Sequence, residues 1–263
     1  MFDMISSRDN QKIKDTAKLI SSAKYRREKG LFVLEGVRLC CDAAQCGITV
    51  CTLFVTDDAL SRYEDKVALI SDVSKETYIV SNEAFEKISE TVSPQGVLAV
   101  CKTPDIEQNT NTIISSGRYI ACENVSDPSN LGAISRTAEA LGVSGMILIG
   151  NCCDPFGPKA QRAAMGSLLR LPLYRFTDIK AAYEFLHERN IFLYASVVDS
   201  TAKKVTDVTF TDGCSVVIGN EGNGLSDDAK LICDERITIP ITGRAESFNA
   251  AAAAAILLWE LLK

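Results

Sequence analysis

The sequence predicts an α/β protein whose second half forms a mostly parallel sheet. From residue 118 onward, short runs rich in β-branched residues alternate with segments of helical spacing. Such alternation places parallel strands in one sheet with helices on its faces. The stretch 104–117 is polar and rich in Asn, Thr and Ser, which is typical of a linker. The predicted organisation is a domain at 1–103, a linker at 104–117 and a domain at 118–263.

The first half is predicted to be a smaller α/β domain. Residues 9–23 have helical spacing, with Ile13, Ala17 and Ile20 on one face. A strand-like run at 31–34 and a helix at 36–46 follow. Strand-like and helical pieces then alternate to residue 100.

The second half contains five predicted strands and five predicted helices. The strands are 119–123, 146–149, 191–198, 215–218 and 237–241. The helices are 131–141, 158–168, 179–188, 226–232 and 247–262. Sheets of this kind bind ligands at the loops beyond the carboxyl ends of their strands, and three of those loops contain unusual residues.

Composition excludes some classes of protein before any motif is considered. With 263 residues and 46% hydrophobic residues, the chain can bury a substantial core. Its longest apolar run, 250–259, is far below the roughly 18 residues of a membrane span, and no signal peptide is recognisable. The ten cysteines lack any C-x-x-C spacing, so we expect reduced thiols in the cytoplasm and no metal site.

Positive charge is concentrated near the amino terminus. The net charge of the chain is −6, yet residues 5–29 hold eight basic and three acidic side chains, a local charge of +5. Phosphate neutralisation requires local Lys and Arg, so this run could dock RNA. A solvated helix face explains the same charges equally well.

The first unusual loop follows the predicted strand 119–123. It reads N-V-S-D-P-S-N-L-G-A-I-S-R-T-A over 124–138, and a helix is expected to begin near Asn130. Arg136 would then lie in the first two turns of that helix, able to point toward the strand ends. The alternative is a helix cap followed by a surface arginine.

The second loop, 217–226, has glycines at positions 219, 222 and 224. This spacing matches neither the dinucleotide fingerprint nor the P-loop. Its glycines would allow close approach of the backbone to a ligand, with Glu221 at the tip of the loop. A tight turn without any ligand is the alternative.

The third loop, 239–249, precedes six consecutive alanines. Ser247 and Asn249 are expected at the start of a helix, where such residues commonly serve only as caps. The alanine face of that helix would allow another backbone to pack closely.

Together the three blocks resemble the SpoU or TrmH family of the SPOUT methyltransferase superfamily. The resemblance lies in N-x-x-D-P-x-N-x-G-x-x-x-R-T-A, G-N-E-G-x-G-L and I-P-x-x-G-x-x-x-S-x-N, and it covers about residues 118–263. Residues 5–36 resemble the substrate-binding domain that often precedes these enzymes and is similar to small ribosomal RNA-binding proteins. This second resemblance assigns RNA binding to Arg8, Lys24, Arg26 and Arg27.

The resemblance implies a carboxyl-terminal trefoil knot, an exception to the rule that chains are unknotted, and a homodimer. It implies S-adenosylmethionine as cofactor, held by Gly219, Glu221, Gly222, Ile239, Phe248 and Asn249. The implied catalytic residues are Arg136, Asn130, Glu221, Ser247 and Asn249.

The implied reaction is methylation of a ribose 2′-hydroxyl, with large-subunit ribosomal RNA favoured as substrate. A transfer-RNA methyltransferase and a non-catalytic RNA-binding module on the same fold are the alternatives. A nucleotide-using α/β enzyme is disfavoured by the glycine spacing.

Overall fold

A computed structural model describes residues 2–106 and 108–263, which divide into two compact units. The first unit comprises residues 2–104 together with Phe156–Arg162, and the second comprises the remaining described residues. Within the described ranges, no helix is both long enough and apolar enough to cross a membrane.

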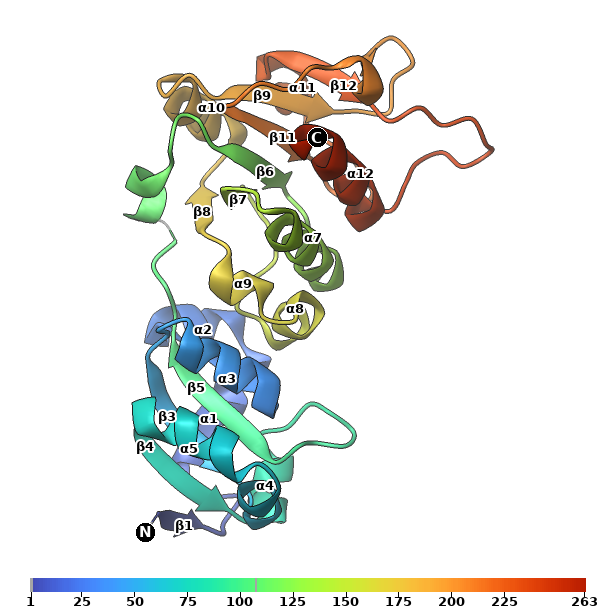
Figure 1. Ribbon diagram of the computed structural model, residues 1–263. Helices are drawn as coiled ribbons and strands as arrows, with labels where there is room; N and C mark the ends of the chain where they lie inside the picture. Colours follow the sequence, from blue (N-terminus) through green and yellow to red (C-terminus); the bar gives the residue numbers. More distant parts are fainter. Residues whose placement is uncertain (1, 107) are drawn as a thin grey trace. The chain divides into compact units, whose positions relative to one another are not determined.

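The first unit is built on a five-stranded sheet in the order β1-β4-β3-β5-β2 (Figure 1). The parallel part pairs β1, β4 and β3, whereas β5 runs antiparallel to both β3 and β2. The strands are β1 (Asp3–Ile5), β2 (Leu31–Glu35), β3 (Val50–Val55), β4 (Ser74–Val80) and β5 (Val97–Lys102).

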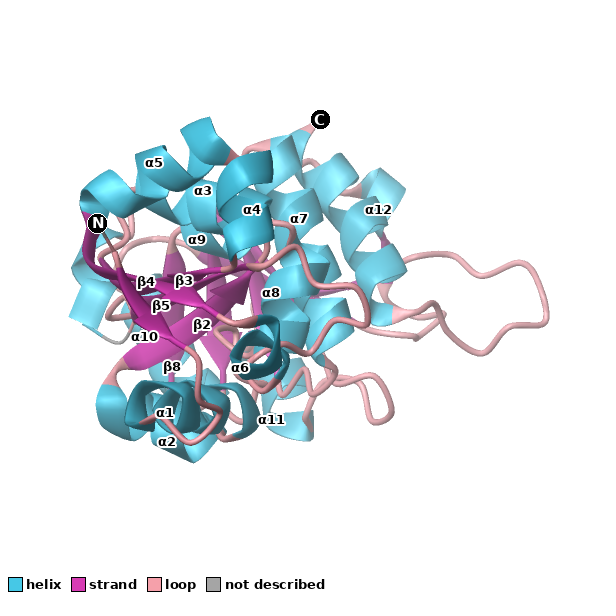
Figure 2. Cartoon of the chain, turned by 90° about the horizontal axis from the view of Figure 1, so that it is seen from below, coloured by secondary structure: helices cyan, strands magenta, loops and turns pink. Residues whose placement is uncertain are grey.

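Helices cover both faces of this sheet, with α3, α4 and α5 on one side and α1 and α2 on the other (Figure 2). The helices are α1 (Gln11–Ser21), α2 (Ala23–Lys29), α3 (Val37–Gln45), α4 (Asp57–Arg62), α5 (Glu64–Val73) and α6 (Asn82–Glu86). Helix α1 buries Ile13 and Leu19, so the predicted apolar face does pack on the sheet.

The second unit contains seven strands in the order β10-β12-β9-β11-β6-β7-β8, and every paired neighbour is parallel. The predicted parallel α/β architecture is therefore confirmed. The strands are β6 (Arg118–Glu123), β7 (Gly145–Ile149), β8 (Leu173–Phe176), β9 (Phe192–Ser196), β10 (Lys203–Lys204), β11 (Cys214–Ile218) and β12 (Glu235–Thr238).

Two pairs of helices flank this sheet, with α7 beside α12 and α10 beside α11. The second-half helices are α7 (Pro128–Leu141), α8 (Pro158–Ala164), α9 (Ser167–Arg170), α10 (Ile179–His187), α11 (Asp227–Ile232) and α12 (Ala250–Leu262). Short 3₁₀ helices lie at Gln108–Thr112 and Val205–Asp207. Because α7 and α12 pack together, the first and third unusual loops are brought close to each other.

The structure differs from the sequence prediction in several local features. The predicted helix 158–168 is broken between α8 and α9, because Met165 and Gly166 adopt positive φ of 52° and 90°. The segment Phe156–Arg162, which includes the start of that predicted helix, belongs to the first unit. There the ring of Phe156 lies 5.1 Å from that of Phe32. Within the predicted linker, Ile113 is buried in the core of the second unit.

Candidate active site

The candidate site lies at the carboxyl ends of the parallel strands of the second unit. Because β11 and β6 are neighbours in register, the loops that follow them emerge at the same edge of the sheet. The loop after β12 returns to α12, which packs on α7, the helix that follows β6. Sheet order and helix packing therefore bring the three predicted loops together.

The glycine-rich loop after β11 folds back on itself. The backbones of Asn220 and Gly224 exchange hydrogen bonds of 3.0 and 2.9 Å. A Cβ atom on Gly219 would lie 2.1 Å from the carbonyl carbon of Gly224, so only glycine fits. Gly224 has a φ of 67°. The expected close approach is therefore made by the loop to its own backbone, which gives the loop a fixed shape.

The carboxylate of Glu221 joins this loop to the start of α7. Its Oε2 accepts hydrogen bonds from the backbone N–H of Ser126 at 3.2 Å and from the Ser126 hydroxyl at 3.1 Å. Its Oε1 accepts from the Asp127 N–H at 3.0 Å and from the Asn130 side-chain amide at 3.1 Å. Both carboxylate oxygens are thus engaged by donors from the neighbouring loop.

These hydrogen bonds determine the charge state of Glu221. Burial alone would raise the pKa of its carboxyl group, but the hydrogen bonds from Asn130 and from backbone N–H groups outweigh burial and lower the pKa from 4.5 to about 2. Glu221 is therefore ionised at neutral pH and is too weak a base to take a proton from a hydroxyl.

Asn130 extends the network to the third loop. Its Oδ1 accepts a hydrogen bond of 3.0 Å from the side-chain amide of Asn249. The Oδ1 of Asn249 in turn accepts from the N–H groups of Ala251 and Ala252 at the start of α12. One chain of hydrogen bonds, from Glu221 through Asn130 to Asn249, therefore links all three predicted loops.

The predicted helix start at 247 needs correction. Helix α12 begins at Ala250 with Asn249 as its cap, and Ser247 lies outside it in an exposed segment. Figure 1 shows the segment between β12 and α12 extending away from the sheet. Among the described residues, Ser247 forms no hydrogen bond with Glu221, Asn130 or Asn249, and it instead lines a cavity beside them.

That cavity has a volume of about 750 Å³ and lies within the second unit. It includes Gly219, Glu221, Gly222, Ile239, Ser247 and Phe248 of the predicted residues. Asn130 and Asn249 are not among its lining residues, so they act on it only through the neighbours that they hold.

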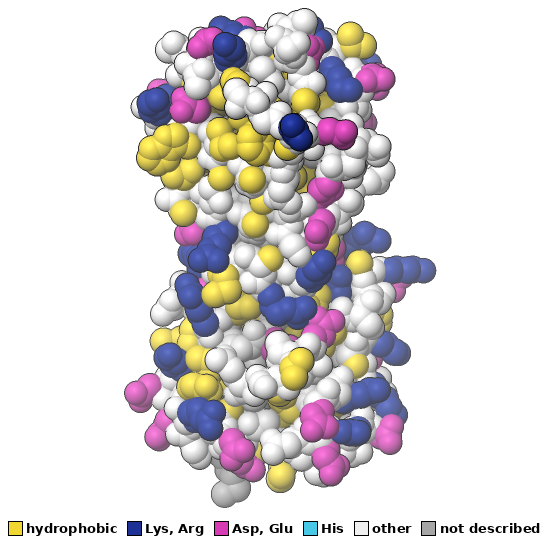
Figure 3. Space-filling view, turned by 90° about the vertical axis from the view of Figure 1, so that its right-hand side faces the viewer, with side chains coloured by type: hydrophobic (Ala, Val, Ile, Leu, Met, Phe, Trp, Pro, Cys, Tyr) yellow, Lys and Arg dark blue, Asp and Glu magenta, His cyan; other side chains and the backbone are white. Residues whose placement is uncertain are grey.

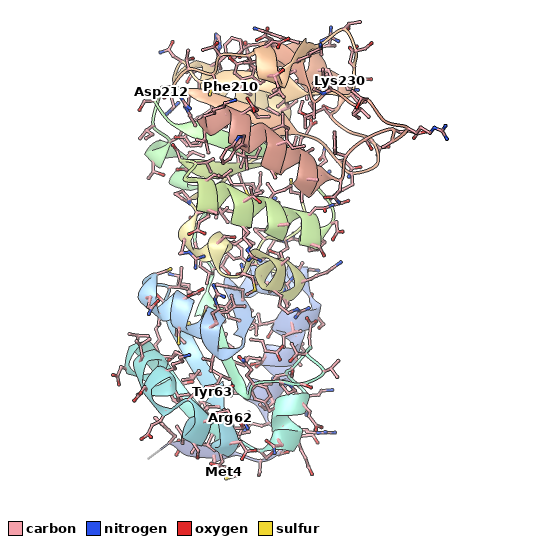
Figure 4. The ribbon with its side chains drawn as sticks, turned by 45° about the vertical axis from the view of Figure 1, so that its right-hand side comes forward. Met4, Arg62, Tyr63, Phe210, Asp212 and Lys230 are labelled. Carbon is pink, nitrogen blue, oxygen red and sulfur yellow. The ribbon has the colours of Figure 1, made fainter. Side chains whose placement is uncertain are left out.

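Several residues in or beside this cavity were not identified from the sequence. Val197 and Asp199 follow β9, which is the neighbour of β11 in the sheet, and Lys230 on α11 also lines the cavity (Figure 4). Buried Glu123, at the end of β6, accepts hydrogen bonds of 2.8 and 2.6 Å from the N–H and hydroxyl of Ser226. Glu123 could have been noticed in the sequence because it is an acidic residue at the end of an apolar strand.

Arg136 lies farther along α7 than expected. Asp127 caps the helix and Pro128 opens it, so Arg136 is in the third turn rather than in the first two. Its side chain is exposed, and no group within residues 2–106 and 108–263 pairs with its guanidinium. It does not line the 750 Å³ cavity.

The predicted RNA contacts of the first unit have different environments. Arg26 is only 7% exposed and donates to the carbonyl oxygens of Leu19 and Ile20 at the end of α1, which contradicts a role in contacting RNA. Arg8 pairs with Glu86 at 2.6 Å. Lys24 and Arg27 are exposed on α2, and Lys24 has only a 3.8 Å pairing with Glu28.

Comparison with known proteins gives two family matches. Residues 117–259 match the SpoU rRNA Methylase family, and residues 10–99 match the MRM3-like substrate binding domain.

Individual relatives resemble the whole chain. The 23S rRNA (guanosine(2553)-2'-O)-methyltransferase RlmP of Bacillus subtilis is 30% identical over 98% of this chain and 98% of its own length. The 23S rRNA (uridine(2479)-2'-O)-methyltransferase of Streptomyces viridochromogenes is 29% identical over 98% and 91%. The AdoMet-bound rRNA methyltransferase from Sinorhizobium meliloti has a TM-score of 0.89 at 27% identity, covering 99% of this chain and 97% of that one.

Proposed function

Because the chain belongs to the SpoU rRNA methylase family, we propose that it methylates a ribose 2′-hydroxyl of large-subunit ribosomal RNA with S-adenosylmethionine. The observation that carries this proposal is the hydrogen-bonded chain from Glu221 through Asn130 to Asn249, which joins three loops beside one cavity that the second and third of them line. The names of the full-length relatives favour ribosomal RNA over transfer RNA.

The cavity suits S-adenosylmethionine in size and chemistry. Its volume of about 750 Å³ is within the range of small-molecule sites. Ile239 and Phe248 supply apolar surface. The cavity is lined by acidic side chains (Asp199, Glu221, Glu246) and basic ones (Lys230, Arg236), which suits a ligand that carries both positive and negative groups. When bound, the cofactor supplies a methyl group already activated by its sulfonium. The 2′-hydroxyl gives its proton to water as it takes the methyl group, and the task of the protein is to hold and align the reacting oxygen.

Arg136 is assigned to the RNA. The guanidinium of Arg136 offers five N–H donors in a fixed fork and no acceptor, which suits it to bind the oxygens of a phosphate. Arg136 is an exposed cation without a partner among the described residues. It can therefore bind the phosphate beside the reacting ribose and stabilise the negative charge that develops on the ribose 2′-oxygen.

Glu221, Asn130 and Asn249 act as positioning residues. The oxygens of Glu221 already accept hydrogen bonds from neighbouring groups, and its pKa of about 2 makes proton transfer unfavourable. The three residues set the relative positions of the glycine-rich loop, the start of α7 and the start of α12. Ser247, at the cavity wall, is free to contact a bound ligand.

A direct test uses the purified protein with cofactor labelled on its methyl group. We expect transfer to a transcript of large-subunit ribosomal RNA and none to a transfer-RNA pool. Transfer to transfer RNA alone would favour the alternative substrate. Binding of RNA without transfer to either would favour a non-catalytic module.

The proposal includes a homodimer formed through α12. Figure 3 shows apolar side chains gathered on the face of the second unit that carries this helix. Trp259 of α12 is 62% exposed, which is unusual for so large an apolar side chain outside an interface. Since Arg136 does not line the cavity of its own chain, a second copy could complete the site.

Replacement of Trp259 by glutamate is expected to convert a dimer into a monomer, because a charge would be buried without a partner in the interface. The measurement is light scattering at micromolar concentration. Leu231→Glu is the matched control, because Leu231 is an exposed apolar residue of α11, 83% exposed. A monomeric parent protein, or a dimeric Trp259→Glu variant, would contradict the assignment.

The proposal assigns RNA docking in the first unit to Lys24 and Arg27. Their joint replacement by glutamate is expected to weaken RNA binding and to lower the slope of log Kd against log salt by about one unit per lost phosphate contact. A titration between low and moderate salt measures this slope. Lys66→Glu with Lys75→Glu provides a matched charge reversal elsewhere in the unit; an equal effect of both pairs would indicate only a general charge effect.

Two further features belong to the proposal. A trefoil knot is supported by the path of the chain, which leaves β12 on one side of β9 and returns in α12 against α7 and β11. A cytoplasmic location is supported by the ten cysteines, which form no disulfide within the described part of the chain.

A further inference from the structure

The first unit contains a second open cavity, of about 530 Å³. It lies among α4, α6 and the loop at 89–96 that precedes β5. Its walls combine apolar surface from Val92 and Pro94 with the polar side chains of Arg62, Asn82 and Gln95. All of these residues fall within the segment that matches a substrate-binding domain.

The loop at 89–96 is held in a fixed shape by one carboxylate. Glu35, at the end of β2, accepts hydrogen bonds from the hydroxyl groups of Ser89 at 2.5 Å and Thr91 at 2.6 Å. Its second oxygen accepts from the backbone N–H of Glu90 at 3.1 Å. These bonds order residues 89–91 at the start of the loop, which reduces part of the entropic cost of binding a ligand.

Gln95 is fixed at the other end of the loop. Its Oε1 accepts a hydrogen bond of 3.0 Å from the N–H of Val37 at the start of α3. Gly36 permits this contact, because its φ is 100° and a Cβ there would lie 3.1 Å from the same oxygen. With its oxygen engaged, Gln95 is left with an oriented amide N–H₂ group as a donor.

The remaining groups suit a nucleotide better than a free anion. Val92 is fully exposed on this fixed loop, so it presents apolar surface that a flat base can cover. Arg62, at the end of α4, is exposed and has no partner among the described residues (Figure 4). Asp58 and Glu86 also line the cavity, and Glu86 is paired with Arg8. The carboxylates of Asp58 and Glu86 disfavour a small free anion, whereas a neutral base joined to one phosphate can place that phosphate beside Arg62.

We propose that this cavity binds one unstacked nucleotide of the RNA substrate. The base packs on Val92 and Pro94, its edge meets the amides of Gln95 and Asn82, and its phosphate pairs with Arg62. Sequence-specific proteins commonly recognise RNA through such splayed bases in loops and bulges. The inference rests on the proposed function, since it takes RNA as the substrate.

The test is an Arg62→Gln, Val92→Ser double variant of the full chain. The probes are a fluorescein-labelled single-stranded RNA of about 12 nucleotides, within the usual span of single-strand sites, and a large-subunit ribosomal RNA transcript. We expect Kd for the oligonucleotide and KM for the transcript to rise about tenfold, with kcat unchanged, because one base packed on apolar surface and one phosphate contact are lost. Both residues are exposed, so the melting temperature should equal that of the parent.

The matched control is Lys66→Gln with Leu69→Ser, which removes an exposed cation and an exposed apolar side chain from α5, outside the cavity. Parental Kd and KM in the Arg62 and Val92 variant would overturn the inference while leaving the proposed function intact. A parent protein that transfers no methyl group would refute the proposed function itself.

Discussion

Replacement of Arg136 by alanine is expected to lower kcat for methyl transfer by about 10²- to 10³-fold, the usual effect of removing one donor that stabilises developing charge. The Kd for S-adenosylmethionine should change little, because Arg136 does not line the cavity assigned to the cofactor. Single-turnover transfer and calorimetric titration measure the two quantities separately.

Two further variants sharpen this result. Arg136→Lys retains the charge but not the planar pair of donors, so it should retain intermediate activity. Lys180→Ala removes an exposed cation of α10 that lies outside the cavity, and it should behave as the parent. If Arg136→Ala weakened cofactor binding as strongly as it slowed transfer, the assignment of Arg136 to the RNA would be wrong.

Replacement of Glu221 by glutamine is expected to damage cofactor binding and transfer together. Glutamine keeps the shape of the side chain but brings an N–H₂ group against donors from Ser126, Asp127 or Asn130. Asn130 cannot rotate to compensate without losing its bond to Asn249. Loss of one hydrogen bond to a charged group corresponds to about 1.5 kcal/mol, so Kd for the cofactor should rise about tenfold or more.

The pH dependence distinguishes this structural role from a role as a base. The pKa of Glu221 is lowered from 4.5 to about 2, so the ionised carboxylate stabilises the folded state above pH 4.5. That stabilisation is lost as the pH falls from 4.5 toward 2. The parent should therefore melt at a higher temperature than Glu221→Gln, with the largest difference at pH 7 and a smaller one below pH 4.5.

A matched control for this variant is Glu246→Gln, since Glu246 also lines the cavity and forms no hydrogen bond or ion pair among the described residues. Its melting temperature should equal that of the parent at every pH. The contradicting result would be a Glu221→Gln variant that binds cofactor normally, loses methyl transfer and shifts the acidic limb of the pH–rate profile. Glu221 would then be a base rather than a positioning residue.

The parallel sheet of the second unit could be predicted because its buried strands are short apolar runs between helical segments. Other features depended on conformations that carry no local signal. The break between α8 and α9 requires positive φ at Met165 as well as at Gly166, and methionine gives no hint of that conformation. Val197 and Asp199 reach the cavity because β9 pairs with β11. That pairing depends on the tertiary fold and cannot be derived from the local sequence.

The site could be located from its motifs, but the roles of individual residues could not be derived from them. Nothing in the spacing of Glu221, Asn130 and Asn249 reveals that they form one hydrogen-bonded chain. In the first unit, the resemblance to a substrate-binding domain, together with the local positive charge, assigned Arg26 to RNA binding. The side chain is instead buried, because carbonyl oxygens at the end of α1 lack partners in their own helix and accept its N–H groups.

The measurement that most directly tests the account is the chemical position of the transferred methyl group. Large-subunit ribosomal RNA labelled by the parent protein is digested completely to nucleosides, which are separated by chromatography against standards. We expect the label to elute with a single 2′-O-methylnucleoside and to be nearly absent after reaction with Arg136→Ala. Label on a base-methylated nucleoside would contradict the proposed reaction.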